Sequence, residues 1–510
     1  MERIYPAIVV IILLLGGCIT QNSVETPTAA PTTTATRTTQ PAYILETPWD
    51  DLSLFRQGLI PKEKTAVDQL SDATVYHLDF TISTDCLSLK GHEEICYTNR
   101  EEERLNEIYL RVFPNTSGGK LSVSNLTVDN QEVEPSYEFQ GSAIRIPLPA
   151  PLQPGKQTII KMDFEVEVAQ EMEGNYGLFG YFEDILALDE FYPVVPVYDD
   201  DGWNVENPPP NGDLTYYDAS FYLVRVTAPP ELRIATSGIE VSRTEKDNQQ
   251  VVSFAAGPAR DFYLAASKSY TVLSNTVGET TINSYAFSGQ ENEAGLALQF
   301  ATDALKSYSE RFGDYPYTEF DVVSTSMKAS GMEYPGIIAV SQKFYDPETK
   351  EKQPPGFFEI VLAHETAHQW FYNVVGNDQV DKPWLDEAVV QYCTGLYQLD
   401  THGETAAQSY RRYSWTDWWA SIEKAEIPIG MSSAAYTERE YGPIVYARGP
   451  LFIEAVKERM GEQKFNAFLR DYYESNKWGI GTEEEFRKIA EQHCNCDLGD
   501  LFEEWVYEDA

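Results

Sequence analysis

Residues 361–370 read Val-Leu-Ala-His-Glu-Thr-Ala-His-Gln-Trp, an apolar run that carries two histidines and one glutamate. The run predicts a buried helix, on which His364 and His368 share one face, one turn apart. Two imidazoles at that spacing can bind one tetrahedral zinc ion. Glu365 then lies close enough to the metal to take a proton from bound water, which is the arrangement of a metalloprotease.

A third zinc ligand is expected, because catalytic zinc sites usually combine three protein ligands with one water. Glu387 follows His368 after eighteen intervening residues, within the segment Trp-Leu-Asp-Glu-Ala. Residues 373–383 contain a glycine and provide a turn, so a second helix can return antiparallel and bring this carboxylate beside the imidazoles. Glu365 would then deprotonate the water for attack on a carbonyl and pass the proton to the leaving amine.

The motif alone also arises by chance in a chain of this length, so its setting decides the interpretation. Charged residues in a buried helix need partners or a metal, which favours the zinc site. Asp386 is expected either to orient a group beside the ligands or to cap its helix locally. The remaining histidines are expected to be structural or superficial: His77, His92, His402 and His493.

Composition limits the class of protein. A chain of 510 residues is too long for one hydrophobic core, so two or more domains are expected. The net charge of −42 and the pI near 4.4 argue against a nucleic-acid partner. We expect a solvated acidic surface, with attraction to cationic peptides as the alternative.

The first half of the chain has the pattern of β-strands. Tyr76, Leu78, Phe80 and Ile82 alternate with polar residues, a period of two that marks half-buried strands. An antiparallel β domain is therefore expected over residues 49–270. The proline- and aromatic-rich stretch 191–198 reads as a loop, which we expect to pack on the domain rather than to line a cleft.

The second half mixes a few strands with many helices, so the fold class is α+β with several domains. Residues 271–510 form the expected second domain, with a helix over 291–312, short strands at 318–324 and 336–341, and the motif helix ending near residue 373. Further helices are expected at 384–400, 407–423, 446–460, 463–476, 483–493 and 498–507.

The amino terminus predicts export. The apolar run 7–15 is too short to span a bilayer, and with the small residues after it reads as a signal peptide over residues 1–17. The ending Leu-Gly-Gly-Cys18 resembles a prokaryotic lipobox, which implies cleavage before Cys18 and a membrane-anchored lipoprotein at the cell surface; a plain signal peptide or a short anchor is the alternative. Residues 18–48 are rich in Thr and Pro and predict a disordered stalk.

Five cysteines remain besides Cys18. Cys86 and Cys96 flank a predicted turn and are candidates to bridge neighbouring strands, which an extracytoplasmic location permits. Cys494 and Cys496 are expected to be too close in sequence to pair with each other, and one of them to reach Cys393.

The motif and its spacing resemble the aminopeptidase N / leukotriene hydrolase family of gluzincin zinc metallopeptidases. Gly331-Met332-Glu333 resembles the family's Gly-x-Met-Glu-Asn motif, and Tyr446-Ala447-Arg448-Gly449 resembles its Tyr-x-Lys-Gly segment. Residues 76–115, 192–203 and 258–267 resemble its amino-terminal domain. The resemblance extends over about residues 65–508 and implies a β saddle-like domain followed by a thermolysin-like catalytic domain that is first α/β and then mostly helical.

The resemblance implies a zinc aminopeptidase acting on peptides with a free amino terminus. His364, His368 and Glu387 would bind one Zn²⁺, and Glu365 would be the general base. Glu333 would bind the substrate α-amine, unless it is a surface carboxylate, and the backbone of Gly331 and Met332 would contact the substrate as an edge strand. Tyr446 would hydrogen-bond the oxyanion, with Tyr441 or Tyr436 as the alternative phenol.

The chain departs from the family pattern at three points. Tyr334-Pro335-Gly336 follows the Gly-x-Met-Glu match in place of asparagine, and Thr366 replaces the commoner leucine between the histidines. The chain stops at residue 510, whereas larger members continue into further domains, so an open active site is expected. Two other functions stay open, a zinc endopeptidase indifferent to Glu333→Ala and a non-catalytic surface protein that binds peptides.

Overall fold

The computed structural model describes residues 44–172, 174–207, 209, 211–422 and 427–507. These described residues belong to one compact unit. The predicted signal peptide 1–17 and Cys18 lie outside the described residues. No helix within the described residues is long and apolar enough to cross a membrane.

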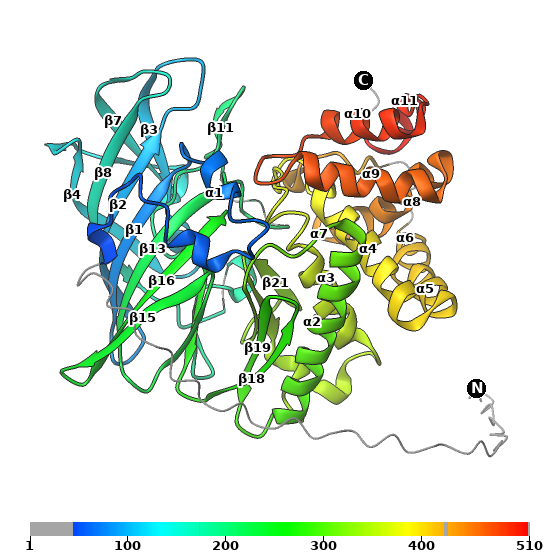
Figure 1. The fold of residues 1–510 in the computed structure, drawn as a ribbon, viewed down its shortest axis with the longest axis horizontal. Coiled ribbons are helices and arrows are strands. Elements are labelled where there is room, and N and C mark those ends of the chain that lie inside the picture. Colours follow the sequence, from blue (N-terminus) through cyan, green and yellow to red (C-terminus); the bar gives the residue numbers. More distant parts are fainter. Residues whose placement is uncertain (1–43, 173, 208, 210, 423–426, 508–510) are drawn as a thin grey trace, which may run out of the picture. The chain divides into compact units, whose positions relative to one another are not determined.

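The predicted strands of the first half form a large sheet (Figure 1). Tyr76, Leu78, Phe80 and Ile82 are buried along β1, as the alternation predicts. Neighbouring strands pair antiparallel except β1 and β13, which pair in parallel, so the sheet is mixed. The strand order is β15 (Ile239–Lys246), β16 (Gln249–Ala259), β13 (Ser220–Ala228), β1 (Val75–Ile82), β2 (Ser88–Thr98), β8 (Gln157–Glu167), β4 (Lys120–Val128) and β5 (Gln131–Glu132).

Two smaller sheets share a hydrophobic core with this sheet. One orders β14 (Arg233–Thr236), β17 (Leu264–Ser267), β10 (Ile185–Leu188) and β9 (Gly180–Phe182); the other orders β3 (Leu105–Arg111), β7 (Ala143–Leu152) and β6 (Ser136–Glu138). Phe191 and Tyr192 are buried in the same core, which confirms that the loop 191–198 packs on the sheets.

The second half begins with a five-stranded sheet. Its order is β18 (Tyr270–Val277), β19 (Thr280–Phe287), β20 (Glu319–Thr325), β22 (Ile337–Ser341) and β21 (Gly331–Tyr334), so β21 is an edge strand. Helix α2 (Glu291–Phe312) packs on β18 and β19, and α3 (Phe357–Ala367) packs on β21 and β22. The predicted domain boundary at residue 270 falls at the start of β18 and stays a prediction.

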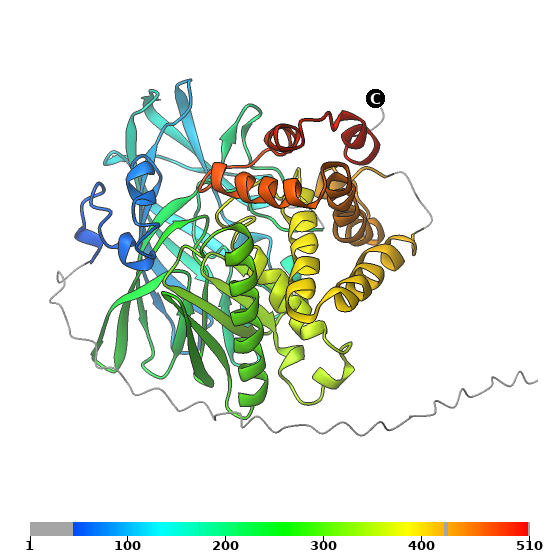
Figure 2. The same cartoon turned by 45° about the vertical axis from the view of Figure 1, so that its right-hand side comes forward.

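The remaining helices surround α4 (Trp384–His402) (Figure 2). They are α5 (Glu404–Tyr410), α6 (Asp417–Trp419), α7 (Glu438–Tyr441), α8 (Gly449–Met460), α9 (Glu462–Ser475), α10 (Glu483–Cys494) and α11 (Gly499–Trp505). Two π-helical segments, Arg411–Thr416 and Gly442–Arg448, interrupt the helices predicted at 407–423 and 446–460. Hydrophobic periodicity does not distinguish such a segment from an α-helix, whereas π-turns often accompany functional sites.

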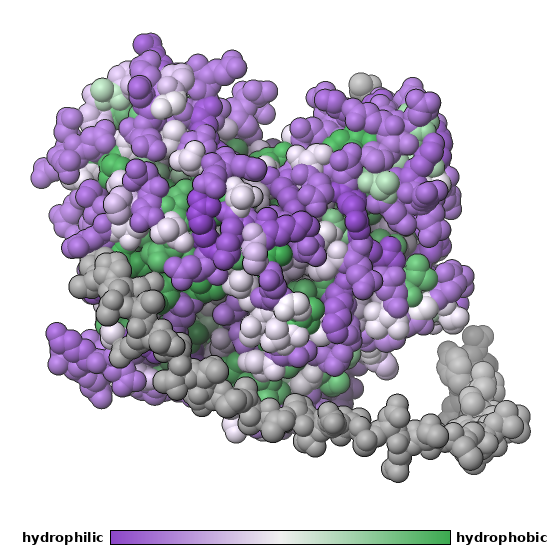
Figure 3. All heavy atoms as spheres, viewed as in Figure 1, coloured by the Kyte–Doolittle hydropathy of each residue, from purple (hydrophilic) through white to green (hydrophobic). Residues whose placement is uncertain are grey.

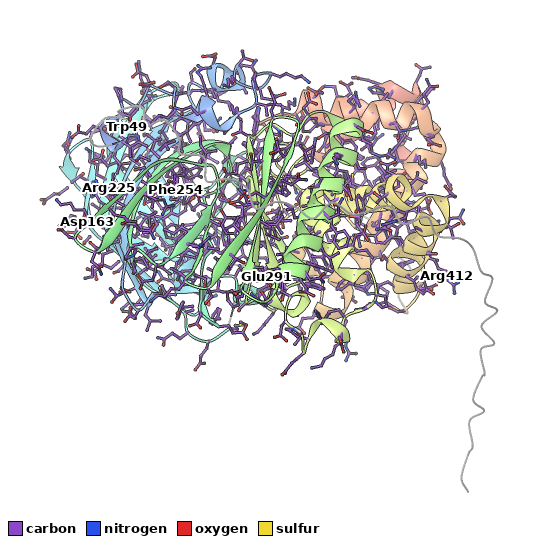
Figure 4. All side chains as sticks on the ribbon, turned by 60° about the horizontal axis from the view of Figure 1, so that its bottom comes forward. Trp49, Asp163, Arg225, Phe254, Glu291 and Arg412 are labelled. Carbon is purple, nitrogen blue, oxygen red and sulfur yellow. A yellow bond between two sulfur atoms is a disulfide. The ribbon has the colours of Figure 1, made fainter. Side chains whose placement is uncertain are left out.

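The last residues of the range expected for the stalk, 44–48, are described, and their start packs on the first half of the fold. Ile44 is buried against the sheet, and the Trp49 ring stacks on His77 with 4.0 Å between ring centroids. Figure 4 shows Trp49 over the large sheet, far from Arg412 on the π-helical segment 411–416. The apolar residues at 44 and 45 distinguish this end of the Thr/Pro-rich tract from the rest.

The cysteine pairing expected from the sequence is wrong. Cys494 and Cys496 bond to each other, and Cys86, Cys96 and Cys393 are buried free thiols. Asn495 adopts a left-handed conformation (φ 52°) at the end of α10, which turns the chain back and brings the two sulfurs together. Cys86 and Cys96 belong to different core clusters on either side of the sheet, so they cannot meet.

Candidate metal centre and active site

Three side chains converge where α3 and α4 pack together. The Nε2 atoms of His364 and His368 lie 3.3 Å apart, and Glu387 Oε2 lies 3.2 Å from the first and 3.5 Å from the second. Tetrahedral ligands about 2.0–2.1 Å from zinc are separated by about 3.3 Å. The three atoms therefore fit one zinc ion without rearrangement, and the structure brings together the residues predicted to bind it.

Each imidazole is oriented by a hydrogen bond from its other nitrogen. His364 Nδ1–H donates to Gln391 Oε1 at 3.1 Å, and His368 Nδ1–H donates to the carbonyl oxygen of Phe371 at 3.2 Å. Gln391 Oε1 also accepts from the Tyr410 hydroxyl at 2.8 Å. Such bonds leave both Nε2 lone pairs directed at the metal position, as in known zinc sites.

The turn that returns α4 toward α3 is held by Arg260, which the sequence analysis missed. Its buried guanidinium donates to the carbonyl oxygens of Tyr217, Tyr372, Val374 and Gly479 at 2.9, 2.7, 3.1 and 2.6 Å. A Cβ atom at Gly376 would lie 2.1 Å from the centre of the guanidinium. Glycine is therefore required there for close approach, whereas the sequence suggested only a turn.

Glu365 lies between the two histidines and faces β21. A Cβ atom at Gly331 would lie 2.3 Å from Glu365 Oε1, so the carboxylate lies directly against the edge strand. Burial, together with the charges of Glu333 and Glu387, raises the pKa of Glu365 well above its usual range. A cation bound among these carboxylates would oppose that shift.

Glu333 is buried on β21 beside the zinc ligands. Its Oε1 atom lies 3.9 Å from His368 Nδ1 and accepts a hydrogen bond of 3.1 Å from Gln379 Nε2. Gln379 Nε2 also donates to Asp386 Oδ2 at 2.8 Å, and Asp386 Oδ1 accepts from the backbone N–H of Glu387. Gln379 thus links the predicted amine-binding carboxylate to the helix that carries the third ligand.

Tyr446 lies in the π-helical segment Gly442–Arg448, and its hydroxyl donates to Glu387 Oε1. Neither of the other two candidate phenols hydrogen-bonds to a predicted ligand in the described structure, although Tyr441 also lines the cleft. Tyr436 donates to the carbonyl oxygen of Pro428 at 2.7 Å, and the Tyr441 hydroxyl is buried with no hydrogen-bond partner in the described structure. Of the three, Tyr446 is the phenol whose hydroxyl contacts a predicted ligand.

Asp213 is a further acidic residue at the site that no sequence signal distinguished from the other carboxylates of this chain. Its side chain hydrogen-bonds Glu387. Burial and the charges of Glu387 and Asp386 raise the pKa of Asp213 well above its usual range.

These residues lie in a cleft of about 630 Å³. Tyr176, Gly212 and Asp213 come from the first half of the chain, whereas the rest of the wall comes from β21 and the loop before it, from α3, α4, α6 and α7, and from the two π-helical segments. The wall includes the exposed aromatic side chains of Tyr413 and Trp418. The cleft thus has two of the three predicted zinc ligands, His364 and Glu387, in its wall together with Glu365.

Comparisons with known proteins agree with this geometry. Residues 296–505 match the peptidase family M1 domain. Aminopeptidase 2 of Candida albicans is 24% identical over 457 residues, covering 84% of this chain and 46% of that protein. Endoplasmic reticulum aminopeptidase 2 of Homo sapiens is 22% identical, covering 69% of this chain and 38% of that protein. The chain thus spans about half the length, or less, of these curated relatives.

A solved structure shares the fold over almost the whole chain. The M1 zinc metallopeptidase from Deinococcus radiodurans superposes with a TM-score of 0.60 at 18% identity, covering 91% of this chain and 96% of that one. The fold, the matched domain and the aminopeptidase relatives lead to one family. The match of residues 296–505 to the peptidase family M1 domain, together with the aminopeptidase relatives and the shared fold, supports the aminopeptidase N family of gluzincins.

Proposed function

We propose that the protein is a zinc-dependent aminopeptidase that removes the amino-terminal residue of peptides. The observation that carries this proposal is the position of Glu333, which has a carboxylate oxygen within 4.8 Å of an oxygen of Glu365 and of a ring nitrogen of His368. It puts a buried carboxylate, suited to an ammonium group, beside the proposed general base and one of the proposed zinc ligands. An anchor so near the metal places the scissile bond one residue from the substrate amine.

Each residue then has a chemical task. A single Zn²⁺ held by His364, His368 and Glu387 would polarise the scissile carbonyl and lower the pKa of the attacking water. Glu365 takes the proton of that water and returns it to the leaving nitrogen. Tyr446 donates a hydrogen bond to the developing oxyanion.

Substrate binding uses the edge of the sheet. Burial and the charges of Asp213 and Glu387 raise the pKa of Glu333 well above its usual range, and a substrate ammonium beside it favours the charged carboxylate. The backbone of Gly331 and Met332 on β21 is free to pair with an extended peptide, because β21 has β22 on one side only.

The test compares substrates that differ only at the amine. The purified protein is assayed on leucine-anilide and on N-acetyl-leucine-anilide, before and after removal of zinc by a chelator. We expect cleavage of the free amine only, loss on chelation and recovery with zinc. Cleavage of N-acetylated substrates alone, or cleavage at an internal bond of peptides with a blocked amino terminus, would instead support a zinc endopeptidase.

We also propose an extracytoplasmic, membrane-anchored location. The lipobox-like ending at Cys18 supports it, and so does the Cys494–Cys496 disulfide, since such bonds persist outside the cytosol. Detergent phase partition of the protein from its host tests the proposal. Cys18→Ser should move the protein from the detergent phase to the aqueous phase, and an unchanged partition contradicts lipidation.

A further inference from the structure

The active-site cleft has a direction set by α3 and β21. Along α3, Ile360 and Phe357 precede His364 by one and about two helical turns on the same face, and both line the cleft. Gly331 lies against Glu365, and Glu333 lies beside His368, so β21 and α3 run the same way. The amine anchor is thus at one end of the cleft, and Phe357 marks the leaving-group end.

Two lysines are associated with the loop that precedes β21 at the leaving-group end: Lys328 lies in this loop, and Lys343, which follows β22, contacts it through Ala329 and Ser330. Lys328 is exposed and lines the cleft, and its backbone N–H donates to the carbonyl oxygen of Tyr176 at 2.8 Å. Lys343 Nζ donates to Ser330 Oγ at 2.9 Å. The next residue, Phe344, packs on Phe357 with 5.8 Å between ring centroids, which places this pair at the same end.

Neither ammonium has a carboxylate within 4.0 Å among the described residues. This is unexpected in a chain with 80 acidic and 38 basic residues, where a lysine finds a carboxylate easily. Lys328 is also the single Lys or Arg among the described residues that line this cleft. Each ammonium has three donors, so both retain N–H groups for another acceptor.

We propose that Lys328 and Lys343 bind a substrate carboxylate at the leaving-group end of the cleft. The enzyme would then prefer short peptides that carry a carboxylate at or near the carboxyl-terminal end. This inference rests on the proposed aminopeptidase function. The carboxylate is either the free carboxyl terminus of a short peptide or an acidic side chain near its end. Together with Glu333 at the amine, the two lysines would fix both ends of the substrate.

The spacing along the edge strand sets the preferred length. A peptide paired antiparallel to β21 from Glu333 passes Gly331 and Ser330 before it reaches Lys328. An extended chain advances about 3.4 Å per residue, so peptides of about three to five residues bring a terminal carboxylate to the two ammonium groups. Longer peptides would pass the lysines without presenting a carboxyl terminus there.

Three tetrapeptides distinguish the sources of the carboxylate: Leu-Ala-Ala-Ala, its carboxyl-terminal amide, and the amide of Leu-Ala-Ala-Glu. Release of free leucine by the zinc-loaded protein is measured for each. We expect kcat/KM for the free acid to exceed that for its amide about tenfold, the size of one hydrogen bond to a charged group. The difference should lie mainly in KM, because the contact is the same in ground and transition states.

A higher kcat/KM for the free acid than for its amide indicates a cation at the leaving-group end. The net charge of −42 disfavours an acidic substrate everywhere except beside local cations. If the Glu-containing amide is cleaved like the free acid, the lysines accept either carboxylate; if it is cleaved like the other amide, they select the terminus. Both results support the inference.

Substitutions test whether the two lysines, rather than the overall charge of the protein, cause the preference for the free acid. Lys328→Met and the double variant with Lys343→Gln should lower the ratio of kcat/KM for the free acid to that for its amide toward one, and Lys328→Arg should keep this ratio. Lys306→Met, an exposed residue of α2 outside the cleft, is the matched control. Equal wild-type rates on acid and amide, or a preference that survives in the double variant, overturn the inference. Failure to release leucine from any peptide would instead overturn the proposed function.

Discussion

Buried carboxylates surround the imidazoles of His364 and His368. The contacts that each carboxylate makes indicate its role. Glu387 contacts both Nε2 atoms, and although burial alone would raise its pKa, the contacts with His364 and His368 lower it, which suits the proposed role of Glu387 as an ionised ligand. Glu365 has no such contact, and its pKa is raised, as a proton acceptor near neutral pH requires. In the proposed mechanism, glutamate side chains therefore serve both as ligand (Glu387) and as base (Glu365).

The first prediction concerns Glu365. Glu365→Gln should lower kcat by about 10²–10⁴, the usual contribution of a general base. Zinc should remain at one ion per chain, because the three ligand atoms are unchanged. Atomic absorption on the dialysed variant, together with kcat on leucine-anilide, checks both statements. Activity equal to that of the wild type would contradict the assignment.

The second prediction separates the phenols of the cleft. Tyr446→Phe should lower kcat by about 10²–10³, the effect of removing one donor to an oxyanion, with KM little changed. Tyr441→Phe is the matched comparison, because it removes a neighbouring buried hydroxyl that has no hydrogen-bond partner in the described structure. We expect it to keep kcat. Steady-state kinetics of both variants decide which hydroxyl acts.

Among the secondary-structure elements, the turn between α3 and α4 decides whether the site exists. The predicted motif helix extended to residue 373, whereas α3 ends at Ala367. Tyr372 has a positive φ of 109°, and the carbonyl of His368 accepts from the N–H of Asn373, so the chain reverses at once. Helical periodicity predicts neither feature, because an apolar sequence packs equally well in a turn.

The third prediction is a double-mutant cycle on this turn. Gly376→Ala should lower the free energy of unfolding by about 2–4 kcal/mol, because the new Cβ overlaps the Arg260 guanidinium. Arg260→Ala should cost about 3–5 kcal/mol, since it leaves buried backbone carbonyls without a donor. With the guanidinium absent, Gly376→Ala should then cost less than it does alone. Urea unfolding of the four proteins measures the coupling, and strict additivity would contradict it.

The three predicted zinc ligands could be identified from the sequence, whereas the residues that position them could not. His364, His368 and Glu387 follow from spacing within two predictable helices, and the structure brings them together. Arg260 lies 104 residues before His364 (364 − 260 = 104), and it looks like any other arginine until the fold brings it to the turn. Gln379 and Asp213 are likewise ordinary polar residues whose positions depend on packing between distant segments.

On the scale of the whole molecule, the net charge predicts a hydrophilic surface, whereas the fold encloses several carboxylates in its interior. The face shown in Figure 3 is mostly hydrophilic, as expected for a chain with a net charge of −42. The fold class followed from the change in hydrophobic period between the two halves, and most predicted helices and strands lie within a few residues of the observed ones. The parallel pairing of β1 with β13 did not follow, because pairing between distant strands leaves no local pattern.

Several carboxylates are nevertheless buried in the interior of the protein. The last prediction concerns one of them, Asp261. Its Oδ2 atom accepts from the Tyr372 hydroxyl at 3.3 Å, and Oδ1 is buried with no hydrogen-bond partner in the described structure. Burial, and secondly the charge of Asp189, raise the pKa of Asp261 to about 8. In the unfolded chain this carboxyl titrates near 3.9.

The sign follows from proton linkage. Between these two pKa values the folded protein holds a proton that the unfolded chain has lost, so stability decreases as pH rises through this window. The contribution of Asp261 is fully present below the unfolded pKa and is lost as pH reaches about 8. Asp261→Asn keeps an acceptor for the Tyr372 hydroxyl and cannot ionise. It should therefore raise the free energy of unfolding at pH 8 by about 1–3 kcal/mol, the usual cost of a poorly compensated buried polar group.

Urea unfolding of the wild type and of Asp261→Asn, each with zinc bound, is measured between pH 5 and pH 8.5. We expect the two curves to separate with increasing pH. Asp163→Asn is the matched control, since Asp163 lies on β8 at the surface and hydrogen-bonds Asn125 and His92 there (Figure 4). Its pKa is lowered by those hydrogen bonds, so its removal should give no gain at high pH. A constant difference between wild type and Asp261→Asn across the range would show that Asp261 does not hold a proton in the folded protein.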